Sequence, residues 1–236
     1  MELIFLDTET TGIDFSKDRL CQVCYRTSKG TRMEYFKPPQ PMSVKAMSVT
    51  HITNKMLEDK PPFSGSPMRA ELESLLASGG VLVAHNAKFD CEMLRAEGLS
   101  VPLSICTLRV ARFLDSKGII PEYNLQFLRY YLDLDVPGSA HDAEGDVNVL
   151  YAVFQRLLSK VREQIPDEQA ALQKMIEISS SPSLLGRFNF GKHKDKTVEE
   201  VARLDKGYLS WLLAQKLASD DKDEDWIYTL QHHLQQ

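Results

Sequence analysis

The sequence predicts an α/β protein with a mixed five-stranded sheet flanked by helices, followed by a small C-terminal α+β unit. Residues 3–37 contain three strand-like segments separated by turn-rich pieces, which is typical of an antiparallel meander. After this meander, short apolar segments alternate with amphipathic segments, which is typical of strands covered by helices. The chain has 236 residues, 43% hydrophobic and 26% charged, so one or two globular domains are expected.

Three strands open the chain, in the order "LIFLDTE", "LCQVCYRT" and "RMEYFK". Beyond the "KPPQP" break, "SVKAMSVTH" and "NKMLED" are short helical candidates. A clearer helix is expected in "PMRAELESLLAS", because it ends at the Gly79-Gly80 pair. The segment "GVLVAHN" is short and fully apolar, so it is expected to form a strand inside the sheet.

The second half of the sheet region continues this alternation. A helix in "AKFDCEMLRAEG" places Phe89, Met93 and Leu94 on one face and ends at Gly98. Next, "LSICTLRVARFLD" predicts a strand that passes into a helix. Two more amphipathic helices are expected in "NLQFLRYYLDL" and "DVNVLYAVFQRLLSKV".

The helical pattern breaks at "SSSPS", which indicates the end of a connecting segment. We therefore expect a first domain over residues 1–162, a connecting segment over 163–183 and a C-terminal domain over 184–236. The last domain contains both tryptophans of the chain, Trp211 and Trp226, which supply apolar bulk for a modest core.

Composition excludes several classes of protein. With 28 basic and 33 acidic residues, the net charge of -5 argues against attraction of the whole surface to nucleic acid, although a local basic groove stays open. No apolar run approaches the ~20 residues of a membrane span, and no secretory signal is evident, so a cytoplasmic protein without a membrane partner is expected. Four scattered cysteines fit reduced thiols, and the isolated Cys21–Cys24 pair does not indicate zinc or redox chemistry.

The acids Asp7 and Glu9 are the first candidates for chemistry. They lie two residues apart in a buried type of strand, so both side chains leave the same face of the sheet. Two neighbouring carboxylates repel each other unless a cation neutralises them, and hard oxygen ligands suit Mg²⁺ or Mn²⁺. The alternative is a strand end with both acids in solvent.

Two further acids begin helices. Asp90 follows the strand "VLVAHN", at a strand end where ligands typically bind, although an acid there can also simply complement the helix dipole. Asp146 is expected in the first turn of a helix that Ser139 or Asp142 can cap. His141 then lies just before this helix, either beside Asp146 or simply exposed to solvent.

Together, "IFLDTETTG", "VAHNAKFD" and "HDAEGD" resemble, in order and spacing, the three motifs of the DEDD, or DnaQ-like, exonuclease superfamily, over about residues 3–160. The resemblance implies an RNase H-like fold. It also implies the histidine subtype, because a histidine stands five residues before the last acid. The catalytic residues implied by this resemblance are Asp7, Glu9, Asp90, His141 and Asp146, with the four acids as metal ligands.

The resemblance implies a 3′→5′ exonuclease that releases nucleoside 5′-monophosphates from DNA with two divalent ions, Mg²⁺ or Mn²⁺, in a role in DNA repair. Asp7 is then expected to bridge both ions, while Glu9 and Asp146 complete one ion site. Asp90 is expected to hold the second ion through water. His141 is expected to take a proton from the attacking water, because imidazole titrates near neutral pH.

Contacts with the terminal nucleotide are expected around these motifs. The Ile13 side chain follows the first acids and can stack on a base, with core packing as the alternative. Phe89 is expected either in the core or against the substrate, and His51 is displaced by one position from the histidine found in relatives. The expected substrate contacts are Thr10, Gly12, Ile13, Met47, Thr50, Asn86 and Phe89.

The C-terminal segment "GRFNFGKHKDKTVEEVARLDKGYLSWLL" resembles the small C-terminal domain of the exonuclease X family. Phe188 and Phe190 alternate with basic residues there, which suits a surface that follows phosphates and stacks on bases. The alternative is an ordinary solvated segment with its aromatic side chains packed inward. The expected nucleic-acid surface comprises Arg187, Lys192, Lys194 and Lys196.

The expected partner is therefore nucleic acid, as DNA 3′ ends that are single-stranded or frayed, with RNA as an alternative substrate. Three other functions stay open: trimming of RNA 3′ ends, proofreading as a DNA polymerase subunit, and nucleic-acid binding without catalysis. The presence of all five motif residues argues against the inactive alternative.

Overall fold

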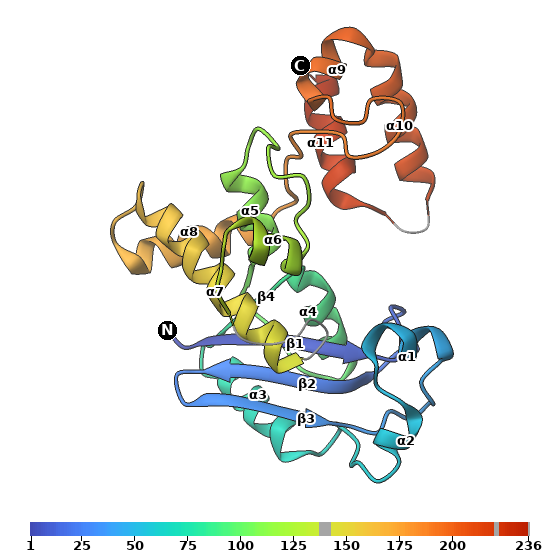
Figure 1. The fold of residues 1–236 in the computed structure, drawn as a ribbon, viewed down its shortest axis with the longest axis vertical. Coiled ribbons are helices and arrows are strands. Elements are labelled where there is room, and N and C mark those ends of the chain that lie inside the picture. Colours follow the sequence, from blue (N-terminus) through green and yellow to red (C-terminus); the bar gives the residue numbers. More distant parts are fainter. Residues whose placement is uncertain (137–142, 220–221, 236) are drawn as a thin grey trace. The chain divides into compact units, whose positions relative to one another are not determined.

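The computed structural model describes residues 1–136, 143–219 and 222–235 (Figure 1). Two compact units divide the chain. The first comprises Met1–Thr107 and Asn124–Arg156, and the second comprises Leu108–Tyr123 and Leu157–Gln236. None of the described helices has the length and apolar character that crossing a bilayer requires. All four cysteines are buried thiols.

A mixed five-stranded sheet forms the centre of the first unit, as the sequence predicts. Its spatial order is β3-β2-β1-β4-β5, with antiparallel pairing between β1, β2 and β3 and parallel pairing between β1, β4 and β5. The central position of β1 explains why its residues 4–6 are buried. The strands are β1 (Leu3–Thr10), β2 (Leu20–Thr27), β3 (Gly30–Tyr35), β4 (Val81–Ala84) and β5 (Ser104–Cys106).

Helices cover both faces of this sheet. On one face, the Phe5 ring contacts Tyr151 and Phe154 of α7 (Ala143–Arg162), each with ring centroids 5.0 Å apart. Figure 1 shows α7 lying across β1. On the opposite face, α3 (Pro67–Ala77) buries Met68, Leu72 and Leu76. Every second residue of a strand faces the same side of the sheet. Asp7 and Glu9 therefore lie on the same side of β1 as Phe5, which is the side that α7 covers.

The remaining helices of the first unit form where the sequence predicts them. Several begin at side-chain caps, in which Ser43, Thr53, Ser66 and Asn124 accept a hydrogen bond from the backbone N–H three residues later. The remaining helices are α1 (Val44–Thr50), α2 (Asn54–Leu57), α4 (Ala87–Ala96) and α6 (Leu125–Tyr131). Ser66 caps α3, whereas α4 begins without a side-chain cap bond.

The second unit is mainly helical. Its C-terminal part has a core in which the Phe188 and Trp226 rings stack with centroids 4.7 Å apart, surrounded by Val198, Leu209 and Leu230. The only bridge between extended segments described there joins Arg187 and Thr197. The helices are α5 (Thr107–Leu114), which continues from β5, then α8 (Glu168–Ser179), α9 (Val198–Leu204), α10 (Lys206–Ala218) and α11 (Glu224–Gln235).

Candidate active site

Strand β1 positions the first two acids at the point where the sheet pairing changes. Asp7 pairs with Cys24 of β2 and Glu9 pairs with Gln22. The register between the two strands shifts between Glu9 and Thr10, directly after the second acid. Such irregularities end regular pairing and redirect the chain, and they are common beside active sites.

Asp90 lies in the first turn of α4, and only 5% of its surface is exposed. The Thr8 hydroxyl donates a hydrogen bond of 2.7 Å to its Oδ1 atom. Sequence reasoning missed Thr8, because strict alternation places it on the other face of β1 from Asp7. The bond joins β1 to α4 and holds the third acid in a defined orientation.

Asp146 lies in the first turn of α7, as the sequence predicts. The Gln126 side chain on α6 donates a hydrogen bond of 2.5 Å from Nε2 to the Asp146 Oδ1 atom. Sequence reasoning also missed Gln126, since no spacing pattern connects two helices that are joined only in the tertiary structure. A neutral donor at this position can orient the carboxylate without removing its negative charge.

Burial and mutual repulsion raise the pKa values of these acids. For Asp7, burial is the largest cause, and Asp90, Glu9 and Asp146 raise its pKa further, well above the usual value. Burial raises the pKa of Glu9 to about 7, with repulsion from Asp146 and Asp90 adding to it. Burial also raises the pKa of Asp90 to about 7, although the bond from Thr8 opposes this rise. Carboxylates from β1, α4 and α7 therefore lie close enough to repel one another.

This donor set suits a hard divalent cation. Within the described ranges, no group of three or more His, Cys, Asp or Glu side chains is arranged to hold a metal ion by itself. Magnesium does not require one, because it keeps several waters and is commonly held by one or two carboxylates together with substrate phosphates. A cation would also relieve the repulsion that raises the pKa values, so the residues present fit such an ion.

The predicted histidine, His141, lies outside the described residues, as do the helix-capping candidates Ser139 and Asp142. Its proposed role therefore rests on its place in the third motif.

Comparison with known proteins identifies the family. The sequence model described as Exonuclease matches residues 4–154, a range that contains all four acids and His141. The chain belongs to this exonuclease family. A second model, described as Exodeoxyribonuclease X-like C-terminal, matches residues 188–216.

Two curated relatives illustrate the similarity of this exonuclease. It is 27% identical to Exodeoxyribonuclease 10 of Escherichia coli strain K12 over 241 residues, covering 99% of both chains. It is 30% identical to DNA polymerase III subunit epsilon of Treponema pallidum over 174 residues, covering 67% of this chain and 77% of that protein.

Solved structures share the fold. A structure of Exonuclease X in complex with 5′ overhanging duplex DNA has a TM-score of 0.55 at 24% identity, covering 75% of this chain and 99% of that one. The zinc-bound complex of E. coli ExoI with single-stranded DNA has a TM-score of 0.59 at 22% identity, covering 73% of this chain and 43% of that one. These likenesses support the RNase H-like mixed sheet.

The loop after β1 places Ile13 of the exonuclease in solvent, with 81% of its surface exposed. Core packing is therefore wrong for this side chain. Thr10 is buried, and its hydroxyl donates to the Gly12 carbonyl at 2.6 Å. A Cβ atom at Gly12 would lie 2.3 Å from the Asp18 carboxylate, so Gly12 leaves the space that Asp18 occupies. Thr10 and Gly12 thus shape the loop that presents Ile13.

The loop is connected to α4 by an aromatic contact. The Phe15 and Phe89 ring centroids are 5.8 Å apart, and both side chains are partly exposed. Phe89 is therefore at the surface beside the Ile13 loop instead of deep in the core. Asn86 is exposed in a left-handed conformation just before α4, and no side-chain cap bond is recorded for it. His85 instead contacts the Thr107 hydroxyl at 2.9 Å.

The contact of Thr50 with the terminal nucleotide stays a prediction, and the structure shows which local bonds its hydroxyl makes. The Thr50 hydroxyl is buried, donates to the Ala46 carbonyl at 3.1 Å and accepts from the Ile52 N–H at 3.1 Å. Its bonding capacity is used to end α1. Met47 is half-buried against a small apolar cluster, so it also contributes mainly to packing.

The basic segment of the C-terminal domain is partly engaged in internal contacts. Arg187 donates to the backbone carbonyls of Gly118 and Asp195, and Lys192 donates to Asp205 at 2.8 Å. Lys194 is exposed and Lys196 is half-buried. The predicted stacking role of Phe188 is wrong, because this ring is fully buried in the domain core.

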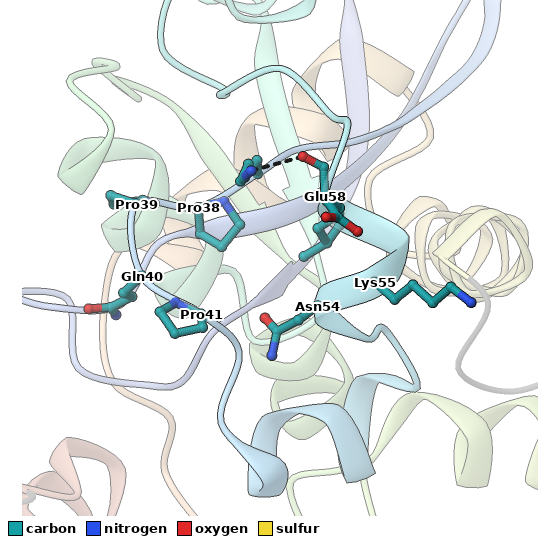
Figure 2. Close-up of a pocket in the computed structure, with 9 residues that line it drawn as sticks. Pro38, Pro39, Gln40, Pro41, Asn54, Lys55 and Glu58 are labelled. Atoms are coloured by element: carbon teal, nitrogen blue, oxygen red, sulfur yellow. Dashed lines mark hydrogen bonds between the residues drawn. The ribbon is translucent and has the colours of Figure 1, made fainter.

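A separate pocket of about 500 Å³ lies between the proline-rich segment after β3 and helix α2 (Figure 2). None of the predicted site residues lines it. The Lys37 ammonium donates to the Glu58 carbonyl at 2.8 Å, and the Asn54 amide is bonded to the Met42 backbone. Since these polar groups already have partners, we assign this pocket no role in the chemistry.

Proposed function

We propose that this exonuclease hydrolyses the terminal phosphodiester bonds of DNA in the 3′→5′ direction and releases nucleoside 5′-monophosphates. The observation that carries the proposal is the convergence of four acids from β1, α4 and α7 into one cluster of mutually repelling carboxylates. Such a cluster is costly without a cation, and metal-assisted hydrolysis of an anionic diester uses one.

Each residue of the site has a proposed role. Asp7, Glu9, Asp90 and Asp146 would hold two divalent ions, Mg²⁺ or Mn²⁺, which when bound neutralise phosphate charge and lower the pKa of water. The Thr8 hydroxyl orients Asp90, and the Gln126 amide orients Asp146. His141 would accept the proton of the attacking water. Exposed Ile13 would contact the terminal base, with Asn86 and Phe89 beside the site.

The relatives support DNA as the substrate, because one is named an exodeoxyribonuclease and another a DNA polymerase III subunit. A proofreading subunit is the second candidate, supported by the 30% identity to subunit epsilon. The match along the whole length to Exodeoxyribonuclease 10, including the C-terminal domain, favours an independent enzyme. Trimming of RNA 3′ ends remains the third candidate. We also propose a role in DNA repair. The proposed location is the cytoplasm, because thiols such as these four stay reduced there.

The test is a gel assay with 5′-labelled single-stranded DNA and RNA of the same sequence, in Mg²⁺, Mn²⁺ or EDTA. We expect the labelled DNA to shorten stepwise with either metal and not with EDTA. A 3′-labelled DNA should release labelled mononucleotide at once. Preferential shortening of RNA would replace the substrate, and cleavage of neither polymer by the wild-type chain would reject the proposed function.

A further inference from the structure

One large aromatic side chain of the C-terminal domain is not used by its core. Trp226 is 6% exposed and stacks on Phe188, whereas Trp211 on α10 is 54% exposed. Phe190 packs against the same core and contacts Trp226 with ring centroids 5.2 Å apart. The two phenylalanines of the basic segment therefore stabilise the fold, whereas Trp211 has more than half of its surface in solvent.

The neighbours of Trp211 on α10 leave its ring open. Residues three and four positions away share a helix face, and at these positions Trp211 has Gly207, Tyr208, Ala214 and Gln215. A Cβ atom at Gly207 would meet nothing closer than the Asp205 carboxylate at 3.9 Å. One small residue thus stands on each side of the indole along the helix, Gly207 before it and Ala214 after it, while Tyr208 lies against the ring.

A chain of ring contacts connects Trp211 to the basic loop 191–196. The Trp211 and Tyr208 centroids are 5.5 Å apart, and those of Tyr208 and His193 are 4.7 Å apart. Gly191 approaches Tyr208 so closely that a Cβ atom there would lie 2.8 Å from the phenol oxygen. Tyr208, which is half-buried, therefore connects the exposed tryptophan to the loop, although the contact through His193 is itself buried. We treat the exposed parts of Trp211, Tyr208 and the loop as one surface.

This surface carries positive charge beside its aromatic rings. Lys192, Lys194 and Lys206 are all exposed around it. Asp205 offsets part of this charge, since its carboxylate bonds both Lys192 and His193. Exposed lysines next to an open indole match the phosphates and the base faces of an unpaired strand. A duplex offers no free base face to such a ring.

We propose that Trp211, with Tyr208 and the lysines at positions 192, 194 and 206, forms a single-strand-binding surface in which a base stacks on the indole. The proposal rests on the proposed function, because a DNA exonuclease has a polynucleotide substrate that this surface can bind. It assigns the C-terminal domain the task of binding the substrate strand at a second place, outside the carboxylate cluster.

The test measures binding of the full chain to fluorescein-labelled dT20 in EDTA, so that cleavage does not interfere. Trp211→Ala should weaken binding about 5- to 150-fold, the range expected from loss of one stacked base. Trp211→Phe should recover most of the affinity while removing the quenching of tryptophan emission by dT20. The control Tyr228→Ala, at an exposed aromatic residue of α11, should bind as the wild type does.

A second substitution separates binding from folding. Gly207→Gln replaces a helical glycine in open space, so it should raise the melting temperature while covering the indole and weakening dT20 binding.

Lys194→Gln should reduce the slope of log K against log salt by about 0.7, the value for one phosphate contact on a single strand.

The outcomes distinguish the two proposals. If wild-type chain shortens DNA but Trp211→Ala and Gly207→Gln bind dT20 as tightly as wild type, the surface is not a strand-binding site and the proposed function stands. Duplex DNA offers a second comparison. If Trp211→Ala weakens the binding of duplex DNA as much as that of dT20, and duplex DNA quenches tryptophan emission equally, base stacking is rejected. If wild-type chain cuts no nucleic acid, the proposed function fails independently of Trp211.

Discussion

At the scale of single residues, the site is defined by charge that the fold does not neutralise by itself. Asp7, Glu9 and Asp90 all have raised pKa values, with burial as the largest cause for each. In an ordinary protein core such groups are paired with cations or replaced by apolar residues. The retained repulsion therefore marks these carboxylates as functional rather than structural groups.

Replacement of Asp7 should separate activity from stability. We expect Asp7→Asn to reduce nuclease turnover by at least about 10²-fold, because it removes a proposed metal ligand. The metal-free protein should melt at the same temperature as wild type or higher at pH 8, because one repelling charge is lost. Turnover and thermal unfolding measured on the same preparation check this. Loss of both would assign Asp7 a structural role.

The raised pKa values also predict how metal binding depends on pH. Glu9 and Asp90 have pKa values of about 7, so each still holds a proton in part of the molecules at neutral pH. Metal binding must displace these protons, and its affinity should therefore rise as pH increases through about 7 and level off above it. Calorimetric titration with Mn²⁺ in buffers of different ionisation enthalpy should reveal proton release at pH 6.5 and little at pH 9.

Stability of the metal-free protein should change in the opposite direction. Unfolded carboxyls titrate near pH 4, whereas these acids titrate near pH 7 in the folded chain, so between these values the folded state binds more protons. The melting temperature should accordingly fall as pH rises through this window. With saturating Mn²⁺ the fall should be smaller, and an identical fall with and without the ion would contradict the assignment.

At the scale of elements, the strand and helix ends bring the site together. Strand β1 ends its regular pairing directly after Glu9, and the chain turns into the loop that exposes Ile13. That loop is held by the Asp18 carboxylate, which accepts from the Thr11 hydroxyl at 2.7 Å and from the Asp14 N–H at 2.8 Å. Helices α4 and α7 each contribute an acid from their first turn, where the helix dipole favours negative charge.

Helix α6 contributes through Gln126, which makes this side chain a positioning residue for Asp146. Gln126→Met keeps the length of the side chain and removes the donor, so we expect Mn²⁺ affinity and turnover to fall about 10- to 100-fold. Electron paramagnetic resonance of free Mn²⁺ gives the affinity without relying on activity.

Gln155→Met is the matched control, because Gln155 is exposed on α7, the helix that carries Asp146. It should leave Mn²⁺ affinity and turnover unchanged. If Gln126→Met also binds Mn²⁺ as wild type does, the hydrogen bond has no role in orienting Asp146.

At the scale of the whole molecule, the second unit joins segments that are distant in the sequence. Arg112 of α5 forms an ion pair with Asp225 of α11, and the other Asp225 oxygen accepts from the Ser183 N–H at 2.7 Å. Arg109 connects α5 to α8 and α11 through Ser179 and Glu224. The domain boundaries expected near residues 162 and 184 stay a prediction. The second unit contains α5 and the loop after it in addition to the C-terminal helices.

Close backbone packing at Gly186 should be sensitive to substitution. A Cβ atom there would lie 2.8 Å from both the Gly118 nitrogen and the Ser116 carbonyl oxygen, and neither backbone atom can move easily. We expect Gly186→Ala to lower the free energy of unfolding by about 1–3 kcal/mol. Urea unfolding measures this. Gly207→Ala, which makes the same chemical change in open space, should not destabilise the chain.

The sequence by itself determined the strands, most helices and the four acids, because periodicity and acids at strand and helix ends are local properties. It also indicated the family, since the three motifs have fixed order and spacing. Only the tertiary structure decided which side chains orient the acids: Thr8 and Gln126 reach Asp90 and Asp146 across elements that no local pattern connects. The same holds for the aromatic residues of the C-terminal domain. Phe188 and Trp211 look equally available in the sequence, and burial alone distinguishes them, because which ring a core encloses depends on how distant helices pack.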